Sequence, residues 1–144
     1  MVFKPHTYKH SAGIPLRAAL YERLTNGMTL EVFNANAPPN QTYPYVILAE
    51  DTTGPEFSTK TTEGEELRLT VNIYAEDNQY GNAYDQLDEF KEQLLVALSM
   101  TPLYLGSHWE VILQGIDSGT RKWRYAIDKA QQIVYLRFKM DYIE

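Results

Sequence analysis

Residues 65–76 alternate between apolar and polar side chains without a break. Four apolar residues would lie on one side of an extended chain, namely Leu67, Leu69, Val71 and Ile73, and four polar ones on the other, namely Arg68, Thr70, Asn72 and Tyr74. A period of two predicts a strand with one face in the core. A chain with so long a half-buried strand has to build a sheet around it.

Two helices are predicted by apolar residues three or four positions apart. The first begins after a Ser11 cap, places Ile14, Ala18, Tyr21 and Leu24 on its apolar side, and stops at Asn26-Gly27. The second covers about residues 82–100 and buries Ala83, Leu87, Phe90, Leu94 and Leu98. Asp85, Asp88, Glu89 and Glu92 lie opposite this stripe, which indicates a solvated helix face rather than an acid/base or metal cluster.

Further strands are predicted at residues 28–33 and 45–50, and near the end of the chain, where Trp109, Val111 and Leu113, then Trp123, Tyr125 and Ile127, then Val134, Leu136, Phe138 and Met140 alternate. A hairpin turning at Asp128-Lys129 would place Trp123 opposite Val134 and turn the aromatic residues inward. Lys122, Arg124, Arg137 and Lys139 would then form one basic stripe on the outer face. We expect this stripe to contact another protein surface.

The order helix, strands, helix, strands predicts an α+β fold: a mainly antiparallel sheet of about five strands with two helices packed on one face. The 144 residues form a single domain, with residues 1–12 as a flexible N-terminal arm.

Residues 51–64 are expected to form a long loop between two strands. They contain Gly54-Pro55, five threonines and one aromatic residue, Phe57. Long loops in compact domains are usually functional or disordered. We expect Phe57, Thr59, Lys60 and Glu63 to belong to an oligomer or partner interface, although Phe57 could equally pack against its own subunit.

Composition excludes several function classes. The chain has no cysteine, which rules out disulfides, thiolate zinc sites and a cysteine nucleophile. His6 and His10 are too few for a structural metal site, and Ser107-His108 has no third group to orient a base. No catalytic, cofactor-binding or metal-binding residues are therefore assigned.

The balance of charge also bears on partners. Thirteen Lys and Arg against nineteen Asp and Glu give a net charge of −6, which disfavours general binding of DNA or anionic membranes. The run Arg121-Lys122-Trp123-Arg124-Tyr125 interleaves basic and aromatic residues, as proteins that bind single-stranded nucleic acid do, and remains the nucleic-acid alternative.

The longest apolar run, residues 43–49, is far shorter than the ~20 residues that span a bilayer. Eleven tyrosines cannot all be buried, and exposed tyrosines are typical of protein interfaces.

Several segments resemble one known family in order and spacing. They are the leading helix "LRAALYERL", then "APP" and "YPYVIL", a polar "STKT" loop, a strand, a long helix, and the closing "VYLRFKM". Together these cover about residues 14–142. They are similar to the phage tail completion proteins, also called tail terminators or tail-to-head joining proteins, of phages with long non-contractile tails.

The resemblance implies a non-enzymatic structural protein of the virion without a cofactor. Such a protein assembles in the host cytoplasm as a hexameric ring, caps the completed tail tube at the tail-neck junction and joins it to the head. Its partners would be copies of itself, the major tail tube protein and a head-completion or connector protein, with genome DNA passing through the ring. The alternatives are another neck or tail protein, or a small-molecule-binding α+β domain with its site in the long loop.

Overall fold

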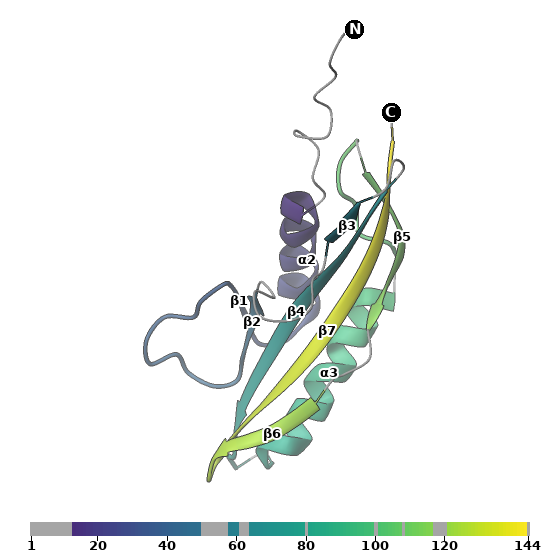
Figure 1. Cartoon of the computed structure of the whole chain (residues 1–144). Coiled ribbons are helices and arrows are strands. Elements are labelled where there is room, and N and C mark those ends of the chain that lie inside the picture. Colours follow the sequence, from purple (N-terminus) through teal and green to yellow (C-terminus); the bar gives the residue numbers. More distant parts are fainter. Residues whose placement is uncertain are drawn as a thin grey trace, which may run out of the picture.

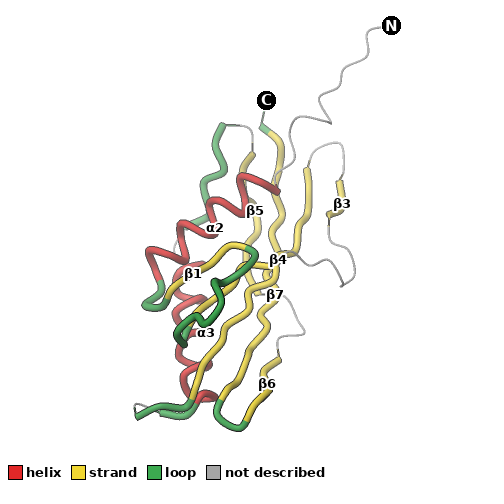
Figure 2. The backbone as a smooth tube through the Cα atoms, turned by 90° about the vertical axis from the view of Figure 1, so that its left-hand side faces the viewer, coloured by secondary structure: helices red, strands yellow, loops and turns green. Residues whose placement is uncertain are grey.

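The computed structural model describes residues 13–49, 58–60, 64–79, 81–99, 101–107, 109–116 and 121–143. Within these ranges the chain forms two helices, α2 (Gly13–Gly27) and α3 (Ala83–Ser99), and seven strands. The strands are β1 (Glu31–Asn34), β2 (Tyr45–Ala49), β3 (Ser58–Lys60), β4 (Gly64–Glu76), β5 (Trp109–Ile116), β6 (Arg121–Ala126) and β7 (Lys129–Tyr142). Both helices lie on the same face of one sheet (Figures 1 and 2).

The sheet is built on two long central strands, β4 and β7, which pair antiparallel from Gly64 opposite Asp141 to Glu76 opposite Lys129. The outer edge of β4 carries β2 and β3 in succession, and the outer edge of β7 carries β5 and β6. Strand β1 pairs with β2 in parallel, and the loop 35–44 that joins them extends away from the sheet (Figure 1). The α+β class with a mainly antiparallel sheet is confirmed. It has seven strands instead of the expected five or so, because two short strands, β2 and β3, pair one after the other along β4, and β5 and β6 do the same along β7.

The predicted alternation of β4 is confirmed. Val71, Ile73 and Ala75 are fully buried under the helices, and Leu67 and Leu69 pack against the same core. Strand β7 contributes Val134, Leu136, Phe138 and Met140 to that core, also as predicted. The polar side chains between them therefore lie on the face away from α2 and α3.

Helix α2 ends at Gly27 as expected and buries Leu24 as predicted, but the rest of its buried side differs from the prediction. Leu16, Leu20 and Leu24 are fully buried, whereas Ile14 is 84% exposed and Tyr21 is 37% exposed. Both sets fit helical spacing, so periodicity alone does not choose between them. Leu24 belongs to both sets, so the choice lies between Leu16 and Leu20 on one side and Ile14, Ala18 and Tyr21 on the other. Burying the leucines places no polar atom in the core, whereas a buried Tyr21 hydroxyl would need a hydrogen-bond partner there.

Helix α3 keeps the predicted apolar stripe and is held at both ends. At its start, the Asn82 side chain accepts a hydrogen bond from the Asp85 backbone N–H (2.9 Å), and Asp77 accepts one from the Ala83 N–H (2.6 Å). At its end, Gln114 donates to the carbonyls of Leu98 (2.8 Å) and Thr101 (3.1 Å). These contacts satisfy groups that a helix end leaves without an internal partner.

The predicted register of the last hairpin is wrong. The turn lies at Ile127-Asp128, and Tyr125 is an extra residue between Arg124, opposite Ala130, and Ala126, opposite Lys129. Moving the turn by one position would have left each side chain of β6 on its predicted face. The extra residue Tyr125 turns the side chains before it in β6 to the opposite face. Trp123 therefore pairs with Gln131 on the face away from the helices, and Lys122 pairs with Gln132 on the helix face.

A second irregularity turns the side chains in the latter half of β5 to the opposite face of the sheet. Trp109 and Val111 are buried as predicted, but the register shifts between Val111 and Leu113. Leu113 then lies opposite Lys139 and is 46% exposed, while Gln114 turns toward the helices. The predicted inward position of Leu113 is therefore wrong.

No helix in the described ranges is long and apolar enough to cross a membrane.

Candidate functional site

The sheet face that points away from α2 and α3 is the candidate functional site. We call it the open face. Its side chains come from alternate positions of the paired strands: Phe33, Tyr45 and Ile47; Glu66, Arg68, Thr70, Asn72 and Tyr74; Trp123 and Tyr125; and Gln131, Ile133, Tyr135, Arg137 and Lys139. Most of them are half-buried although they lie on the outside of the sheet, because neighbouring long side chains cover one another.

One end of the open face is a tyrosine cluster, made of Tyr43, Tyr45, Tyr74 and Tyr125. The Tyr45 and Tyr74 rings stack with centroids 4.8 Å apart, and Tyr43 lies 5.2 Å from Tyr45. Tyr125 meets the edge of Tyr74 at 6.3 Å, and its hydroxyl shares a 2.6 Å hydrogen bond with that of Tyr43. These contacts join the long loop before β2 to the bulge of β6.

Neighbouring groups fix the cluster and change its acidity. Gln131 donates to both the Asn72 side-chain carbonyl (3.0 Å) and the Tyr74 hydroxyl (3.1 Å). Desolvation, followed by the nearby Tyr43, raises the pKa of Tyr45 to about 12. Desolvation, followed by the hydrogen bond with Tyr43, raises the pKa of Tyr125 as well. Tyr45 and Tyr125 therefore keep their protons at physiological pH, and the ring contacts and hydrogen bonds hold the cluster in one arrangement, which lowers the entropic cost of binding.

The other half of the open face holds a basic centre, made of Arg68, Arg137 and Lys139. Arg137 forms an ion pair with Glu66, and the Arg68 guanidinium lies 5.8 Å from the centre of the Tyr135 ring. Arg137 and Lys139 are exposed. Glu66 lies among these three basic groups, and the strand register places Asp141 and Glu110 on the same face beyond Lys139, so positive and negative groups alternate in this half of the open face.

The predicted basic stripe is divided between the two faces. Lys122 and Arg124 lie on the helix side, because the Tyr125 bulge reverses their orientation. Lys122 pairs with Asp88 of α3 (2.7 Å) and lies 4.8 Å from the Tyr84 ring centre. Arg124 pairs with Asp77 (3.2 Å). These two residues attach β6 to α3, and only Arg137 and Lys139 remain on the open face.

The loop predicted at residues 51–64 is interrupted by a strand, since Ser58–Lys60 pairs with β4. The backbone of Thr59 and Lys60 therefore belongs to the sheet, opposite Glu66 and Glu65. Phe57 and Glu63 lie outside the described residues. The proposed interface role of these four residues stays a prediction.

The outward side of α3 carries an acidic stripe, made of Asp85, Asp88, Glu89 and Glu92. All four are exposed, as predicted for a solvated face. Val96, 60% exposed, continues the same side of the helix toward its C-terminus. Among the described residues, no three His, Asp or Glu side chains are grouped so that they could hold a metal ion. The stripe is therefore a charged surface.

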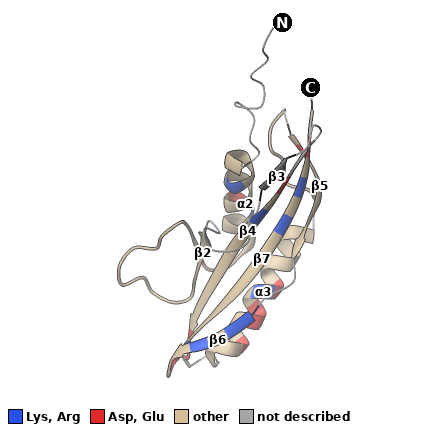
Figure 3. Ribbon diagram, viewed as in Figure 1, with Lys and Arg blue, Asp and Glu red and all other residues tan. Residues whose placement is uncertain are grey.

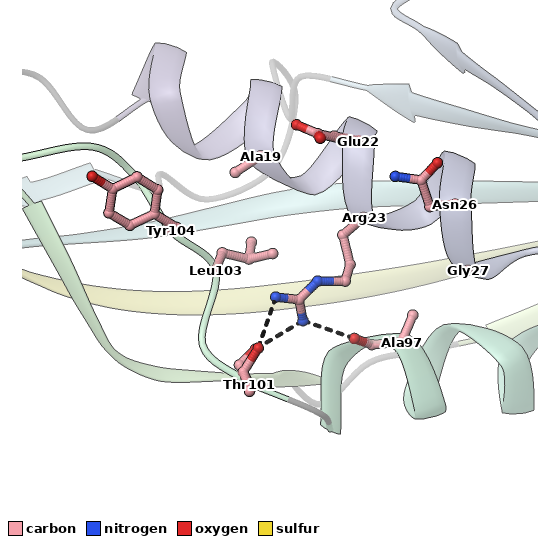
Figure 4. Close-up of a pocket in the computed structure, with 9 residues that line it drawn as sticks. All are labelled: Ala19, Glu22, Arg23, Asn26, Gly27, Ala97, Thr101, Leu103 and Tyr104. Atoms are coloured by element: carbon pink, nitrogen blue, oxygen red, sulfur yellow. Dashed lines mark hydrogen bonds between the residues drawn. The ribbon is translucent and has the colours of Figure 1, made fainter.

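A shallow groove of about 550 Å³ lies between α2, the end of α3 and the segment that follows it (Figure 4). Arg23 crosses it and donates to the carbonyl oxygens of Ala97 (2.9 Å) and Thr101 (2.8 Å). Gly27 lies where an added Cβ would be 3.1 Å from that of Ala97, so the two helices approach closely here. Since the guanidinium is engaged by carbonyls of the last turn of α3 and of the segment after it, its role in this groove is structural.

Sequence reasoning did not find the tyrosine cluster. The high tyrosine count was a real signal, and the spacing of Tyr43 and Tyr45 put both on one side of an extended segment. The contact with Tyr125 depends on a bulge that no local pattern marks. Chemically, the open face offers aromatic rings, amides and cations in a fixed array, which suits recognition of another macromolecular surface.

The sequence matches no family model and no curated protein. Solved structures share the fold. One is a chain of the virion of a native gene transfer agent particle, with 16% identity and a TM-score of 0.69 over 92% of this chain and 99% of that chain. Another is protein gp17 of bacteriophage SPP1, with 18% identity and a TM-score of 0.52 over 96% and 94% of the two chains. The likeness therefore extends over nearly the whole of both matched chains.

Proposed function

We propose that this chain is a structural virion protein that forms a hexameric ring on the completed tail tube and joins the tail to the head. The observation that carries the proposal is the full-length likeness to a virion chain of the gene transfer agent particle, with a TM-score of 0.69. The likeness to gp17 of bacteriophage SPP1 supports the same class of particle. The order of sequence segments described above independently favours a tail completion protein.

The surfaces of the molecule suit assembly better than catalysis. The open face is a rigid, aromatic and partly exposed array, and aromatic residues are enriched at the energetic centres of protein interfaces. The acidic stripe lies on the opposite side of the molecule. A head-to-tail ring requires two different surfaces that meet between neighbouring subunits, and the molecule offers two different ones. In this role the chain has no catalytic function, its partners are the tail tube and a head connector, and genome DNA passes through the ring.

The experiment is to measure the mass of the purified chain by native mass spectrometry and to image it by negative stain. Rings of six chains are expected, on their own or after addition of the tail tube protein. A strictly monomeric chain under both conditions would contradict the proposal. Gold-labelled antibody on intact particles separates the alternatives, since label at the neck supports tail completion and label elsewhere supports another tail protein.

A further inference from the structure

We propose that the loop of residues 35–44 of one subunit inserts into the groove between α2 and the end of α3 of the next subunit. The occupant of the groove is therefore a second copy of this chain, and the segment that enters it carries Pro38 and Pro39. This inference rests on the proposed ring. It goes further by naming a projecting loop and a groove, beside the two faces described above, as parts of neighbouring copies that meet.

The first argument is that the loop is a fixed projection that its own subunit leaves uncovered. At one end the Ala35 N–H donates to the Leu48 carbonyl (2.8 Å), and at the other the Tyr43 hydroxyl shares its hydrogen bond with that of Tyr125 (2.6 Å). Between these ends the loop extends away from the sheet (Figure 1), and residues 38–40 are exposed. A projection whose ends are already held loses little conformational freedom when it binds.

The backbone of the loop adds a second sign of a binding segment. Ala35 has a φ of 74° and Asn40 a φ of 62°, both in the left-handed region. Asparagine tolerates this region, whereas alanine is strained in it. Such strain persists only where the surrounding structure holds it, and it is concentrated at functional sites. Here it occurs at the residue where the chain leaves β1 and enters the projection.

The second argument is that the loop carries no charge. No Lys, Arg, Asp or Glu lies between Glu31 and Glu50, although 22% of the chain is charged, and Figure 3 shows the loop without a coloured residue. Each copy has a net charge of −6, so an uncharged projection can enter a second copy without adding like charge to the contact or burying a charge without a partner. The lack of cations also argues against DNA as the partner of the loop.

The third argument is that the groove offers the surface that such a loop requires. Figure 4 shows Tyr104 and Leu103 on the side across from α2, and Tyr104 is 80% exposed. Proline-containing segments bind against exposed aromatic side chains, and the fixed φ of proline lowers the cost of ordering them. The volume of about 550 Å³ lies within the roughly 300–1,000 Å³ of sites that enclose small ligands, so it can take a few residues of a loop.

The polar groups of the groove also suit an uncharged segment. Arg23 already donates to two carbonyls of its own chain, so the groove does not require an anion. Glu22 and Asn26 line the groove from α2 and are exposed. The side-chain amides of Asn36 and Asn40 can donate to such groups without bringing a charge.

The positions of the two parts favour contact between copies. The groove lies on the helix side of the sheet, whereas Tyr43 fixes the loop to the tyrosine cluster of the open face. One subunit therefore presents the projection and the groove on different sides. A contact between them is heterologous and repeats from copy to copy, as a ring requires.

The turn between β6 and β7 is the rival projection, because Ile127 there is 94% exposed. Its neighbours Asp128 and Lys129 are charged, and the Arg124 guanidinium donates to its carbonyl (3.1 Å). Insertion of this turn into a groove would remove water from those charges, which is costly. The loop has no such groups, so the observations favour the loop.

Two variants test the contact from its two sides. Tyr104→Ala removes the exposed ring from the groove, and a chain with Pro38→Glu and Pro39→Glu brings two carboxylates toward Glu22. Each should raise the concentration needed for half-maximal assembly by at least about tenfold. Ile127→Ala, which also removes an exposed apolar side chain, is the matched control and should change little. Circular dichroism establishes that every variant is folded.

A cross-linking experiment separates this inference from the proposed ring. Because the chain has no cysteine, Asn36→Cys in the loop and Asn26→Cys at the groove introduce single thiols. The two variants are mixed, alone and with the tail tube protein, and a short bismaleimide should join them into heterodimers. Asn36→Cys mixed with Glu92→Cys, on the exposed side of α3, is the control.

The outcomes are distinct. Hexamers without this cross-link would overturn the inference and leave the ring. The cross-link without hexamers would support the inference and contradict the ring, and a chain that neither assembles nor cross-links in either mixture would overturn both.

Three further outcomes would overturn the inference. A chain that carries both Asn36→Cys and Asn26→Cys and cross-links only within itself would show that the loop fills its own groove. Weaker assembly of Ile127→Ala with normal assembly of Tyr104→Ala would assign the contact to the turn between β6 and β7. If Tyr104→Ala forms normal rings that no longer bind the tail tube protein, the groove takes that protein instead.

Discussion

Tyr45 and Tyr125 hold their protons more tightly in the folded chain than in the unfolded one. Desolvation and the nearby Tyr43 raise the pKa of Tyr45 to about 12, and desolvation and the hydrogen bond with Tyr43 raise the pKa of Tyr125 too. An unfolded tyrosine titrates near ~10. A folded-state pKa that is raised gives stability that is fully present below the unfolded pKa and is lost as the pH rises through the folded value.

We therefore expect the free energy of unfolding to fall as the pH rises from about 10 to 12. Urea unfolding at a series of pH values measures this, and phenolate absorbance reports the titration. Tyr43→Phe removes the bond to Tyr125, so it should make the fall smaller. Tyr21→Phe, on the exposed side of α2, is the control. The same loss of stability in the Tyr43→Phe chain as in the original would contradict the assignment.

Arg23 makes a second testable contribution, to stability rather than to ligand binding. It donates to the carbonyl of Ala97, in the last turn of α3, and to that of Thr101, in the segment that follows the helix. Hydrogen bonds to charged groups contribute about 1.5–3 kcal/mol, and partial exposure reduces this. Arg23→Ala should therefore lower the free energy of unfolding by about 1–2 kcal/mol. Arg23→Lys should recover part of it, because an ammonium cannot reach both carbonyls in a fork.

Helix α2 shows how far its sequence determines its orientation. Its existence and its end at Gly27 follow from spacing and from Asn26-Gly27. Its buried side does not, because Leu24 fits two stripes: one with Leu16 and Leu20, which the core takes, and one with Ile14, Ala18 and Tyr21. Leu20→Ala should lower the free energy of unfolding by about 2–5 kcal/mol, and Tyr21→Ala by less than ~1 kcal/mol. Equal costs would contradict the observed orientation.

The start of α3 is expected to depend on pH through Asp77. The Ala83 backbone N–H, and after it Arg124, hold the pKa of this carboxyl below its usual value. A lowered folded-state pKa gives stability that is present above the unfolded pKa, near ~3.9, and is lost as the pH falls through the folded value. Asp77→Asn should therefore flatten the loss of stability below about pH 4, measured by urea unfolding. Glu89→Gln, which removes a carboxylate from the exposed side of α3 without touching this contact, is the control.

The strands show the same division between what is local and what is not. The alternation of β4 and of the second half of β7 was predictable, because each pattern is complete within its own segment. The extra residues at Tyr125 and near Ile112 were not predictable, since a bulge depends on the partner strand and leaves no mark of its own. Each extra residue turns the side chains beyond it to the opposite face of the sheet. They explain why Lys122, Arg124 and Leu113 were assigned to the wrong side, and with them half of the basic stripe.

Assembly into the proposed ring gives one expectation about salt for the whole molecule. Each copy carries a net charge of −6, so copies repel one another, and this repulsion is screened as the Debye length falls from ~10 Å at 0.1 M to ~3 Å at 1 M salt. Apolar contacts between copies are not weakened by salt. The concentration for half-maximal assembly, measured by analytical ultracentrifugation, should therefore fall between these two salt concentrations. A rise over the same range would mean that attraction between opposite charges, rather than apolar contact, holds the ring.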